Sequence, residues 1–351
     1  ATATNWDLGT TPTTNDNIVI PTGASNLPVS VTTAQGFYNG QVQTSASLIN
    51  TNTLSIAGNL FNSGMLTSTA GTIAYNGNTP QQIAASTFTD NSIKGLTINN
   101  EAGVSLNGAL TVSDVVTPTS GTLATNNFLT LSSNATTTAR IAAGTGTYIS
   151  GNVTVQRYIP GGRRTSRFIG HPFSNASSMN SLIDDIYVTG AGGTANGFDA
   201  TSTNNPSAFW FDNSANQTWT PFTSVSNANW TQYRGIRLLV RGDRNQPTTL
   251  TGANPTPNAV TLDMDGVVNM NNQNIAIPTG YSVVSNPYPS PINLGSRLNS
   301  TSNIGTQYWV WDANGGVSAG SYITKIIGGG AYNLAMSGAF VVNPTSATTI
   351  N

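Results

Sequence analysis

Histidine, cysteine and glutamate, on which most enzyme sites depend, are almost absent from this chain. His171 is the only histidine, Glu101 is the only glutamate, and there is no cysteine. A Ser-His-Asp triad would have to use His171, and a zinc site cannot assemble the several nitrogen or sulfur ligands that it needs. His171 lies in Gly170-His-Pro172, at an expected strand end. We therefore expect it to pack and hydrogen-bond locally rather than to catalyse a reaction.

A glycosidase needs a pair of carboxyl groups, which here would come largely from aspartates. The candidates all lie in the second half of the chain: Asp184, Asp185, Asp199, Asp212, Asp243, Asp263 and Asp265. β-Helical polysaccharide lyases and hydrolases depend on carboxylates and basic residues along their repeats. The repeat region of this chain offers only Asp90, Lys94, Glu101, Asp114 and Arg140. We therefore expect no enzyme activity, and a polysaccharide-degrading enzyme is the less favoured alternative.

Asp263-Met-Asp265-Gly266 has the alternating carboxylates of a calcium loop. It lacks the further ligands and the terminal glutamate of an EF-hand, so a solvated hairpin turn is favoured over a structural calcium site at Asp263 and Asp265. The adjacent Asp184 and Asp185 repel one another unless a cation or an arginine lies nearby. We expect no other cofactor.

Four arginines form the one basic cluster of the sequence: Arg157, Arg163, Arg164 and Arg167. The cluster has two interpretations, a site for phosphate or sulfated glycan and a set of ion pairs at a domain junction, and we favour the junction.

Tryptophans in the same half are candidates for stacking on sugar rings. They are Trp210, Trp219 and Trp230, to which Trp309 and Trp311 are added as a pair that shares one sheet face. For that pair we favour a place in the protein core.

Charged residues make up only 7% of the 351 residues, against a typical value of about 25%, and the formal net charge is −1. Such a surface has a weak long-range field, which argues against nucleic acid or acidic membranes as partners. No apolar run approaches the length of roughly 20 residues that a membrane-spanning helix needs. Ala1 is expected to be a mature terminus from which a signal peptide has been removed.

A short unit repeats between about residues 53 and 155, an apolar-x-apolar triplet flanked by Gly or Asn. Examples are Leu54-Ser-Ile56, Leu110-Thr-Val112, Leu129-Thr-Leu131 and Val153-Thr-Val155. The steps from Leu110 to Leu129 and on to Val153 suit the coils of a right-handed parallel β-solenoid (β-helix), with Gly and Asn at the corners. The opening segment, from Asn5 to Gly23, would cap the first coil. An antiparallel sandwich would also give short, closely spaced strands and stays open as an alternative.

Composition changes after Ile159, where Pro160-Gly-Gly162 breaks the repeat and aromatic residues become frequent. The sequence therefore predicts two domains in an all-β chain: a β-solenoid over 1–158 and a jelly-roll-like β-sandwich over 159–351. A single helical turn is predicted over Ser178 to Ile186. The predicted sandwich strands cover 167–169, 208–211, 218–222, 235–241, 259–262, 281–284, 308–311, 321–327 and 338–342.

Several segments of the chain resemble segments of a known protein family. Val155-Gln-Arg-Tyr-Ile159 with Gly162-Arg-Arg-Thr-Ser-Arg-Phe-Ile-Gly-His-Pro-Phe173, the block Asn286-Pro-Tyr-Pro-Ser290 and the segment Tyr308-Trp-Val-Trp-Asp312 resemble large surface proteins of Bacteroidetes exported by the type IX secretion pathway. The opening Trp6 to Gly23 is similar to the start of those proteins. The resemblance implies an adhesin-like, secreted or cell-surface protein with a β-helix and a β-sandwich, and it implies no enzyme activity or site residues.

These observations predict a non-catalytic, extracellular structural or adhesive protein that self-assembles into a filament or surface layer. Expected partners are copies of itself, other surface proteins or glycans, and a carbohydrate-binding module is the alternative.

Overall fold

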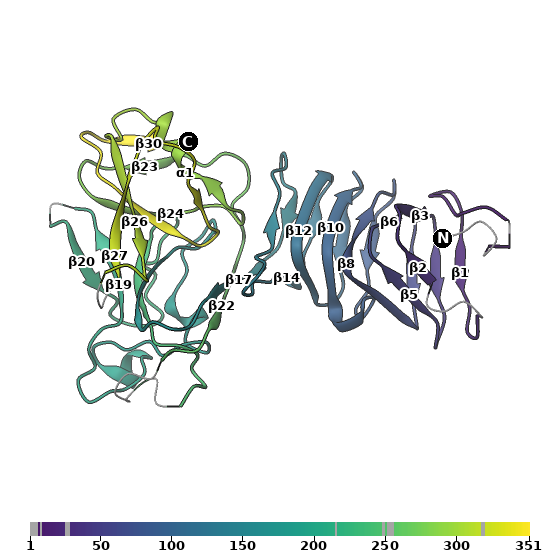
Figure 1. The fold of residues 1–351 in the computed structure, drawn as a ribbon, viewed down its shortest axis with the longest axis horizontal. Helices are drawn as coiled ribbons and strands as arrows, with labels where there is room; N and C mark the ends of the chain where they lie inside the picture. The colour runs from purple at the N-terminus through teal and green to yellow at the C-terminus, as the bar shows by residue number, and fades with distance from the viewer. Residues whose placement is uncertain are drawn as a thin grey trace. The chain divides into compact units, whose positions relative to one another are not determined.

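The computed structural model describes residues 6–7, 9–24, 29–214, 216–247, 250, 256–316 and 320–351. The chain forms two compact units with the boundary between Val155 and Gln156. The boundary predicted after Tyr158 lies on the same strand, β17 (Val153–Ile159). The structure is nearly all β, with 42% strand and 5% helix. In Figure 1 the first unit runs from purple to blue and the second from teal to yellow.

The first unit is a parallel β-solenoid of about seven turns, which confirms the predicted fold. Its strands stack along three sides. The first side is formed by two sheets. One sheet consists of β1 (Ile18–Ile20), β4 (Gly40–Val42) and β7 (Leu60–Asn62). The other sheet, in the later coils, consists of β9 (Gln81–Ile83), β11 (Val104–Leu106), β13 (Leu123–Ala124) and β16 (Ile149–Ser150). The second side holds β2 (Val29–Val31), β5 (Ser47–Asn50), β14 (Leu129–Leu131) and β17, and the third side holds β3 (Gln35–Phe37), β6 (Thr53–Ile56) and β15 (Arg140–Ile141). The long strands β8 (Met65–Tyr75), β10 (Ser92–Asn99) and β12 (Leu110–Ser120) bend around the corner between the second and third sides.

The predicted triplets are the units that stack. Leu110 pairs with Leu129, and Leu129 pairs with Val153, in parallel register. The apolar residues of each triplet point inward: Leu129 and Val153 are fully buried, whereas the middle Thr130 and Thr154 are partly exposed. Because side chains alternate along a strand, the triplets of successive coils contribute apolar residues to one continuous interior.

Buried amide side chains hold the corners between coils. Asn100 is fully buried, donates to the backbone oxygen of Thr79 (2.8 Å) and to Oε1 of Gln81 (2.8 Å), and accepts from the N–H of Ala102 (2.9 Å). Gln81 in turn donates to the carbonyls of Ile56 (2.9 Å) and Gly58 (2.7 Å) of the preceding coil. These amides satisfy backbone groups that the short strands leave open.

Corner glycines are required where coils approach one another closely. A Cβ on Gly64 would collide with the carbonyls of Gln43 and Ala46, and one on Gly121 with the carbonyl of Asn100. Gly121 also has a φ of +75°, a region that residues with a Cβ rarely adopt. The glycines between triplets therefore have structural roles.

The opening segment covers the interior at the first coil. Trp6 and Pro12 lie beside the interior residues Ile20 and Phe37, and the methyl group of Thr14 lies against Gly36. Their positions agree with the cap that the sequence predicts, because apolar side chains from the first coil would otherwise face water.

The second unit contains two four-stranded antiparallel sheets. The first sandwich sheet has the order β18 (Thr165–Ile169), β21 (Ile236–Val240), β19 (Ala208–Asp212), β20 (Thr218–Pro221). The second sandwich sheet has the order β24 (Ser282–Ser285), β29 (Ala339–Val342), β26 (Gln307–Asp312), β27 (Ser321–Ile326). Eight of the nine sandwich strands that the sequence predicts are these, whereas the ninth, β22 (Val260–Gly266), forms a strand that belongs to neither sandwich sheet. Two further pairs, β23 (Ile275–Ile277) with β30 (Thr348–Ile350) and β25 (Ile292–Asn293) with β28 (Asn333–Leu334), are additional.

The two sandwich sheets pack face to face. Phe168 of β18 belongs to one buried cluster with Val283, Ala339 and Val341 of the second sheet. Its ring stacks on that of Trp311, with centroids 5.3 Å apart and an interplanar angle of 6°. The antiparallel sheets are consistent with the predicted β-sandwich.

The opposite face of the second sandwich sheet is also covered. Tyr308, Val310 and Phe340 pack there against Leu294 and Leu298 of the helix α1 (Leu294–Asn299). The sequence did not predict this helix. Where it predicted a turn over Ser178 to Ile186, the structure has a 3₁₀ helix at Met179–Ser181. Two more 3₁₀ helices span Thr89–Asn91 and Gly193–Asn196.

Asn286, the first residue of the Asn286-Pro-Tyr-Pro-Ser290 block, is an internal hydrogen-bonding centre. It is fully buried and donates to the carbonyls of Ser290 (2.8 Å), Leu334 (3.3 Å) and Ala335 (3.1 Å). Its side-chain oxygen accepts from the N–H of Tyr288 (3.0 Å). The block is therefore a structural turn rather than a ligand site.

The amide network of the solenoid gives a test. Asn100→Ala should lower the free energy of unfolding by about 1–3 kcal/mol, because it removes the hydrogen bonds that this buried amide makes with the carbonyl of Thr79, with Oε1 of Gln81 and with the N–H of Ala102. Urea unfolding followed by circular dichroism measures this loss. The neighbouring exposed Asn99 is the control, and Asn99→Ala should change stability by less than about 0.5 kcal/mol. Equal effects of the two changes would contradict the assigned role.

Candidate functional site

His171 is part of the core of the second unit. It is 1% exposed, and its ring stacks on Phe173 (centroids 5.5 Å apart) and meets Trp230 edge-on (5.1 Å). Nε2 lies 3.2 Å from the carbonyl oxygen of Trp230, and Nδ1 accepts from the N–H of Phe173 (3.3 Å). Burial lowers the pKa of His171 to about 4. The imidazole is therefore neutral at pH 7 and is held by backbone groups.

Asp185 and Asp263 lie together at a partly buried acidic cluster. Oδ2 of Asp185 accepts from the N–H of Asp263 (2.7 Å). Burial, together with the charges of Asp263, Asp184 and Asp243, raises the pKa of Asp185 to about 6, against the opposing effect of the hydrogen bond from the N–H of Asp263. Burial likewise raises the pKa of Asp263.

The structure puts the calcium candidates Asp263 and Asp265 on strand β22, whereas the sequence analysis favoured a hairpin turn. Among the residues that the structure describes, no group of three or more His, Cys, Asp or Glu side chains is arranged to hold a metal ion.

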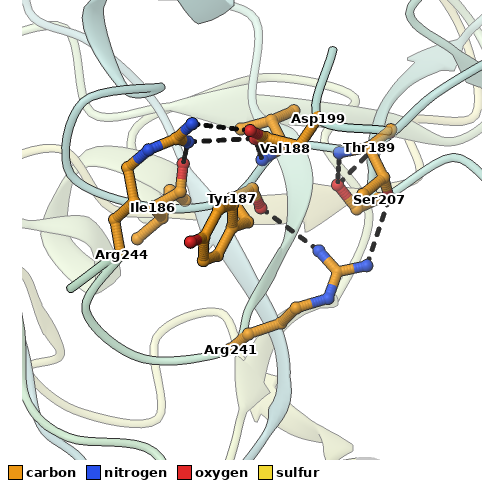
Figure 2. A network of polar contacts seen from close by, with 8 residues as sticks. All are labelled: Ile186, Tyr187, Val188, Thr189, Asp199, Ser207, Arg241 and Arg244. Carbon is orange, nitrogen blue, oxygen red and sulfur yellow. Dashed lines mark hydrogen bonds and ion pairs between the residues drawn. The ribbon is translucent and has the colours of Figure 1, made fainter. Parts of the chain in front are cut away.

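An arginine network links the segment 186–199 to Arg241 and Arg244, which follow β21 in the chain (Figure 2). Arg244 forms a two-point ion pair with Asp199, at 2.6 and 3.0 Å, and its guanidinium lies 4.5 Å from the ring centre of Tyr187. Arg241 donates to the carbonyl of Tyr187 (3.2 Å) and to the hydroxyl of Thr189 (3.1 Å). These contacts cross-link backbone segments of the second unit, so we assign the network a structural role.

Arg241 of that network is 7% exposed. Its Nε is buried and has no hydrogen-bond partner among the described residues. Burial, together with the charge of the nearby Arg164, lowers the pKa of Arg241 to about 10.

Two of the four clustered arginines contact backbone carbonyls within the second unit. Arg163 donates to the carbonyls of Asn314 (2.5 Å), Gly315 and Gly316 (3.1 Å each), at the turn between β26 and β27. Arg167 donates to the carbonyls of Arg163, Thr165 and Ser166 at 3.4 to 3.5 Å. Burial lowers the pKa of Arg157 and of Arg167. Arg163 therefore fastens a turn of the second sandwich sheet.

The tryptophan candidates differ in exposure. Trp230 is fully buried, and its Nε1 donates to the carbonyl of Arg234 (3.1 Å), so it offers no ring face to a ligand and serves the core. Trp210 is half-buried under Arg234, whose guanidinium lies 4.5 Å from its ring centre. Trp219 is half-buried and packs between the sandwich sheets.

Aromatic rings from both sandwich sheets meet at one side of the cluster around Phe168. Trp219 lies edge-on to Phe168 and to Phe211, with centroids 5.3 Å apart in each pair. Tyr322 lies edge-on to Trp311 (5.0 Å). Arg237 covers Trp219 at 4.8 Å. Since the arginine faces the interior rings, its charge is partly buried between the sheets.

The aromatic rings continue onto an exposed surface of the second sandwich sheet, which we call the aromatic shelf and which consists of Tyr281, Gln307, Trp309, Thr324 and Ile326. Trp309 pairs with Thr324, and Gln307 pairs with Ile326. The rings of Tyr281 and Trp309 have centroids 5.8 Å apart. Tyr281 is 45% exposed and Ile326 is 54% exposed. The shelf therefore presents two neighbouring rings with an amide and a hydroxyl beside them.

The second feature of this region is the outer edge of β27. Among the residues that the structure describes, this strand pairs with β26 alone, at the end of the sheet order. Three of its apolar side chains, Tyr322, Ile323 and Ile326, are 49%, 38% and 54% exposed. Its one charged residue, Lys325, lies over the ring of Tyr332 (5.1 Å). An edge strand with exposed apolar side chains is a template for pairing with another strand.

Comparisons of the chain with protein-family models, with curated proteins and with solved structures give no match. Within the described part of the chain, none of the helices has the length and apolar character needed to span a membrane.

The sequence analysis did not select Tyr281, Gln307 or the edge of β27. The alternation in Gln307-Tyr-Trp309-Val-Trp311 shows which residues share a face, and we correctly placed Trp309 and Trp311 together. It does not show which part of that face is covered, because both faces of this sheet carry apolar residues. Exposure at the shelf depends on where the first sandwich sheet ends, which is a tertiary property.

The acidic cluster gives a pH-dependent test. The raised pKa of Asp185 means that the folded state binds its proton more tightly than the unfolded state, so stability is lost as pH rises from about 4 through about 6. Asp185→Asn keeps the acceptor for the N–H of Asp263 and should raise the free energy of unfolding by about 1–2 kcal/mol at pH 8, after allowance for solvent screening, and by almost nothing at pH 4. Thermal unfolding at the two pH values measures the difference. A variant that is less stable than the parent at pH 8 would show that the ionised carboxylate is needed there, as it would be beside a cation.

Proposed function

We propose that this protein is a non-catalytic structural or adhesive module of an extracellular surface, which assembles with copies of itself through the edge of β27. The proposal rests on one observation, which is that the edge strand β27 exposes apolar side chains. Natural proteins protect edge strands with charges, prolines, bulges or a covering element. The segment from Ser321 to Ile326 has no proline, and its one charged residue, Lys325, lies over the ring of Tyr332.

The low charge of the chain supports the same proposal. With 7% charged residues and a formal net charge of −1, two copies meet little electrostatic repulsion. Exposed apolar side chains on the strand add buried area when a second strand pairs with it. A strand added from another copy would extend the second sandwich sheet by backbone hydrogen bonds, with side chains setting the register.

The residues that a reaction would need support a role without catalysis. The one histidine is buried, neutral at pH 7 and bonded to backbone groups. Its position suits packing rather than proton transfer, because a general base must reach a substrate. The resemblance of the Asn286 block and its companion segments to secreted surface proteins supports a location outside the cell.

Substitution at the edge tests the proposal. Ile323→Lys places a charge on the exposed edge strand, and the like charges of two approaching copies should raise the dissociation constant of assembly by at least about tenfold. Sedimentation velocity over a concentration series, with negative-stain microscopy of the same samples, measures assembly. Phe61→Lys, at a residue of β7 that is 64% exposed, adds the same charge far along the chain and is the control.

The expected result is assembly by the parent and the control, and a monomer for Ile323→Lys. A parent that stays monomeric at every concentration would contradict self-assembly, as would an Ile323→Lys variant that assembles as readily as the parent.

A further inference from the structure

The aromatic shelf has the composition of a carbohydrate-binding surface. A pyranose ring has an apolar face of C–H groups and a rim of hydroxyls, so it is matched by an aromatic ring with uncharged hydrogen-bonding groups beside it. Tyr281 and Trp309 supply two rings whose planes differ by 54°. Gln307 and Thr324 supply an exposed amide and an exposed hydroxyl on the same face.

Tyr281 is held in place by its backbone. Its N–H donates to Oε1 of Gln217 (2.6 Å), and the amide of Gln217 in turn donates to the carbonyls of Asn213 (3.1 Å) and Ser214 (3.2 Å). Gly280 packs against the Gln217 side chain, so a Cβ there would crowd it. An exposed ring on a fixed backbone loses little conformational freedom when a ligand stacks on it.

Trp309 is fixed by the sheet. It pairs with Val341 of β29 and with Thr324 of β27, and it packs against the buried cluster that contains Val283. One part of the indole is therefore anchored between the sheets while the residue as a whole stays partly exposed. Rings that are held on rigid strands make more precise contacts than rings on loops.

The charge of the shelf distinguishes the class of ligand. Its five residues are all uncharged. The nearest charges of the same strands face elsewhere, since Lys325 lies over Tyr332 and Asp312 pairs with Ser321 at the far end of the hairpin. A surface without cations does not compensate sulfate or carboxylate groups.

We propose that the aromatic shelf binds a neutral oligosaccharide by stacking sugar rings on Tyr281 and Trp309, with hydrogen bonds to Gln307 and Thr324. This inference does not rest on self-assembly. Ile323 points to the opposite side of β27 from Thr324, so a substitution there leaves the shelf intact.

Titration calorimetry of the full chain tests the site. The probes are soluble hexasaccharides of β-1,4-linked glucose, xylose and mannose and of α-1,4-linked glucose, together with a sulfated hexasaccharide. Tyr281→Ala and Trp309→Ala should each weaken the binding of a neutral probe by about tenfold or more. Tyr281→Phe keeps the ring and should bind like the parent.

Tyr38→Ala, at a tyrosine of the first unit that is 42% exposed, controls for loss of any exposed ring. If Trp309→Ala unfolds the sheet, Tyr281→Ala still tests the site, because Tyr281 is an exposed residue. Binding that survives in Ile323→Lys would support the shelf independently of assembly. The proposal is overturned if no neutral probe binds at about 1 mM, if the sulfated probe binds more tightly than every neutral one, or if Tyr281→Ala binds like the parent.

Discussion

Backbone groups between short strands must find hydrogen-bond partners, and in this protein uncharged amides supply many of them. Asn100 and Gln81 link successive coils of the solenoid. In the second unit, Asn286 donates to three backbone carbonyls, and Asn269 donates to the carbonyls of Phe173 (3.2 Å) and Pro287 (2.9 Å). Each amide has donors and an acceptor, so one side chain serves backbone groups of both kinds. The fold can therefore be ordered although charged residues are scarce.

The same constraint shapes the surface. Where charges are few, solubility depends on hydroxyls and amides, and few charges are left to protect strand edges, since the edge strand β27 has a single charged residue, Lys325. The shelf and the edge of β27 lie on neighbouring strands of one sheet, where apolar groups remain exposed beside uncharged polar ones. Both proposals, assembly through the edge of β27 and ligand binding at the shelf, depend on these exposed apolar groups.

Period and composition were sufficient to predict most strands of the fold. The triplet from Leu129 to Leu131 identified the stacking unit, and turn residues located nine of the strands of the second half. The helix α1 was missed because Leu294 and Leu298 give only one apolar turn, and its start depends on Asn293 accepting from the N–H of Ser296 (3.3 Å). So short a helix is stabilised by tertiary packing rather than by propensity.

The candidate site was less predictable, because exposure and long-range contacts decide it. Trp230 and Trp309 have the same stacking chemistry, but one is fully buried and the other lies where the covering sheet ends. The partners of Arg163 lie in the turn before β27, which no local pattern around Arg163 indicates. Sequence patterns show the periodicity along one strand, whereas the exposure of a tryptophan and the partners of an arginine depend on which strands pack together.

Salt dependence of stability tests most directly whether uncharged amides, rather than ion pairs, hold this fold together. Screening at about 0.5 M NaCl weakens interactions between charges and leaves amide hydrogen bonds almost unchanged. Urea unfolding at low salt and at about 0.5 M NaCl should therefore give free energies that agree within about 0.5 kcal/mol. A loss of more than about 2 kcal/mol in high salt would show that charge pairs carry the stability and would contradict this account.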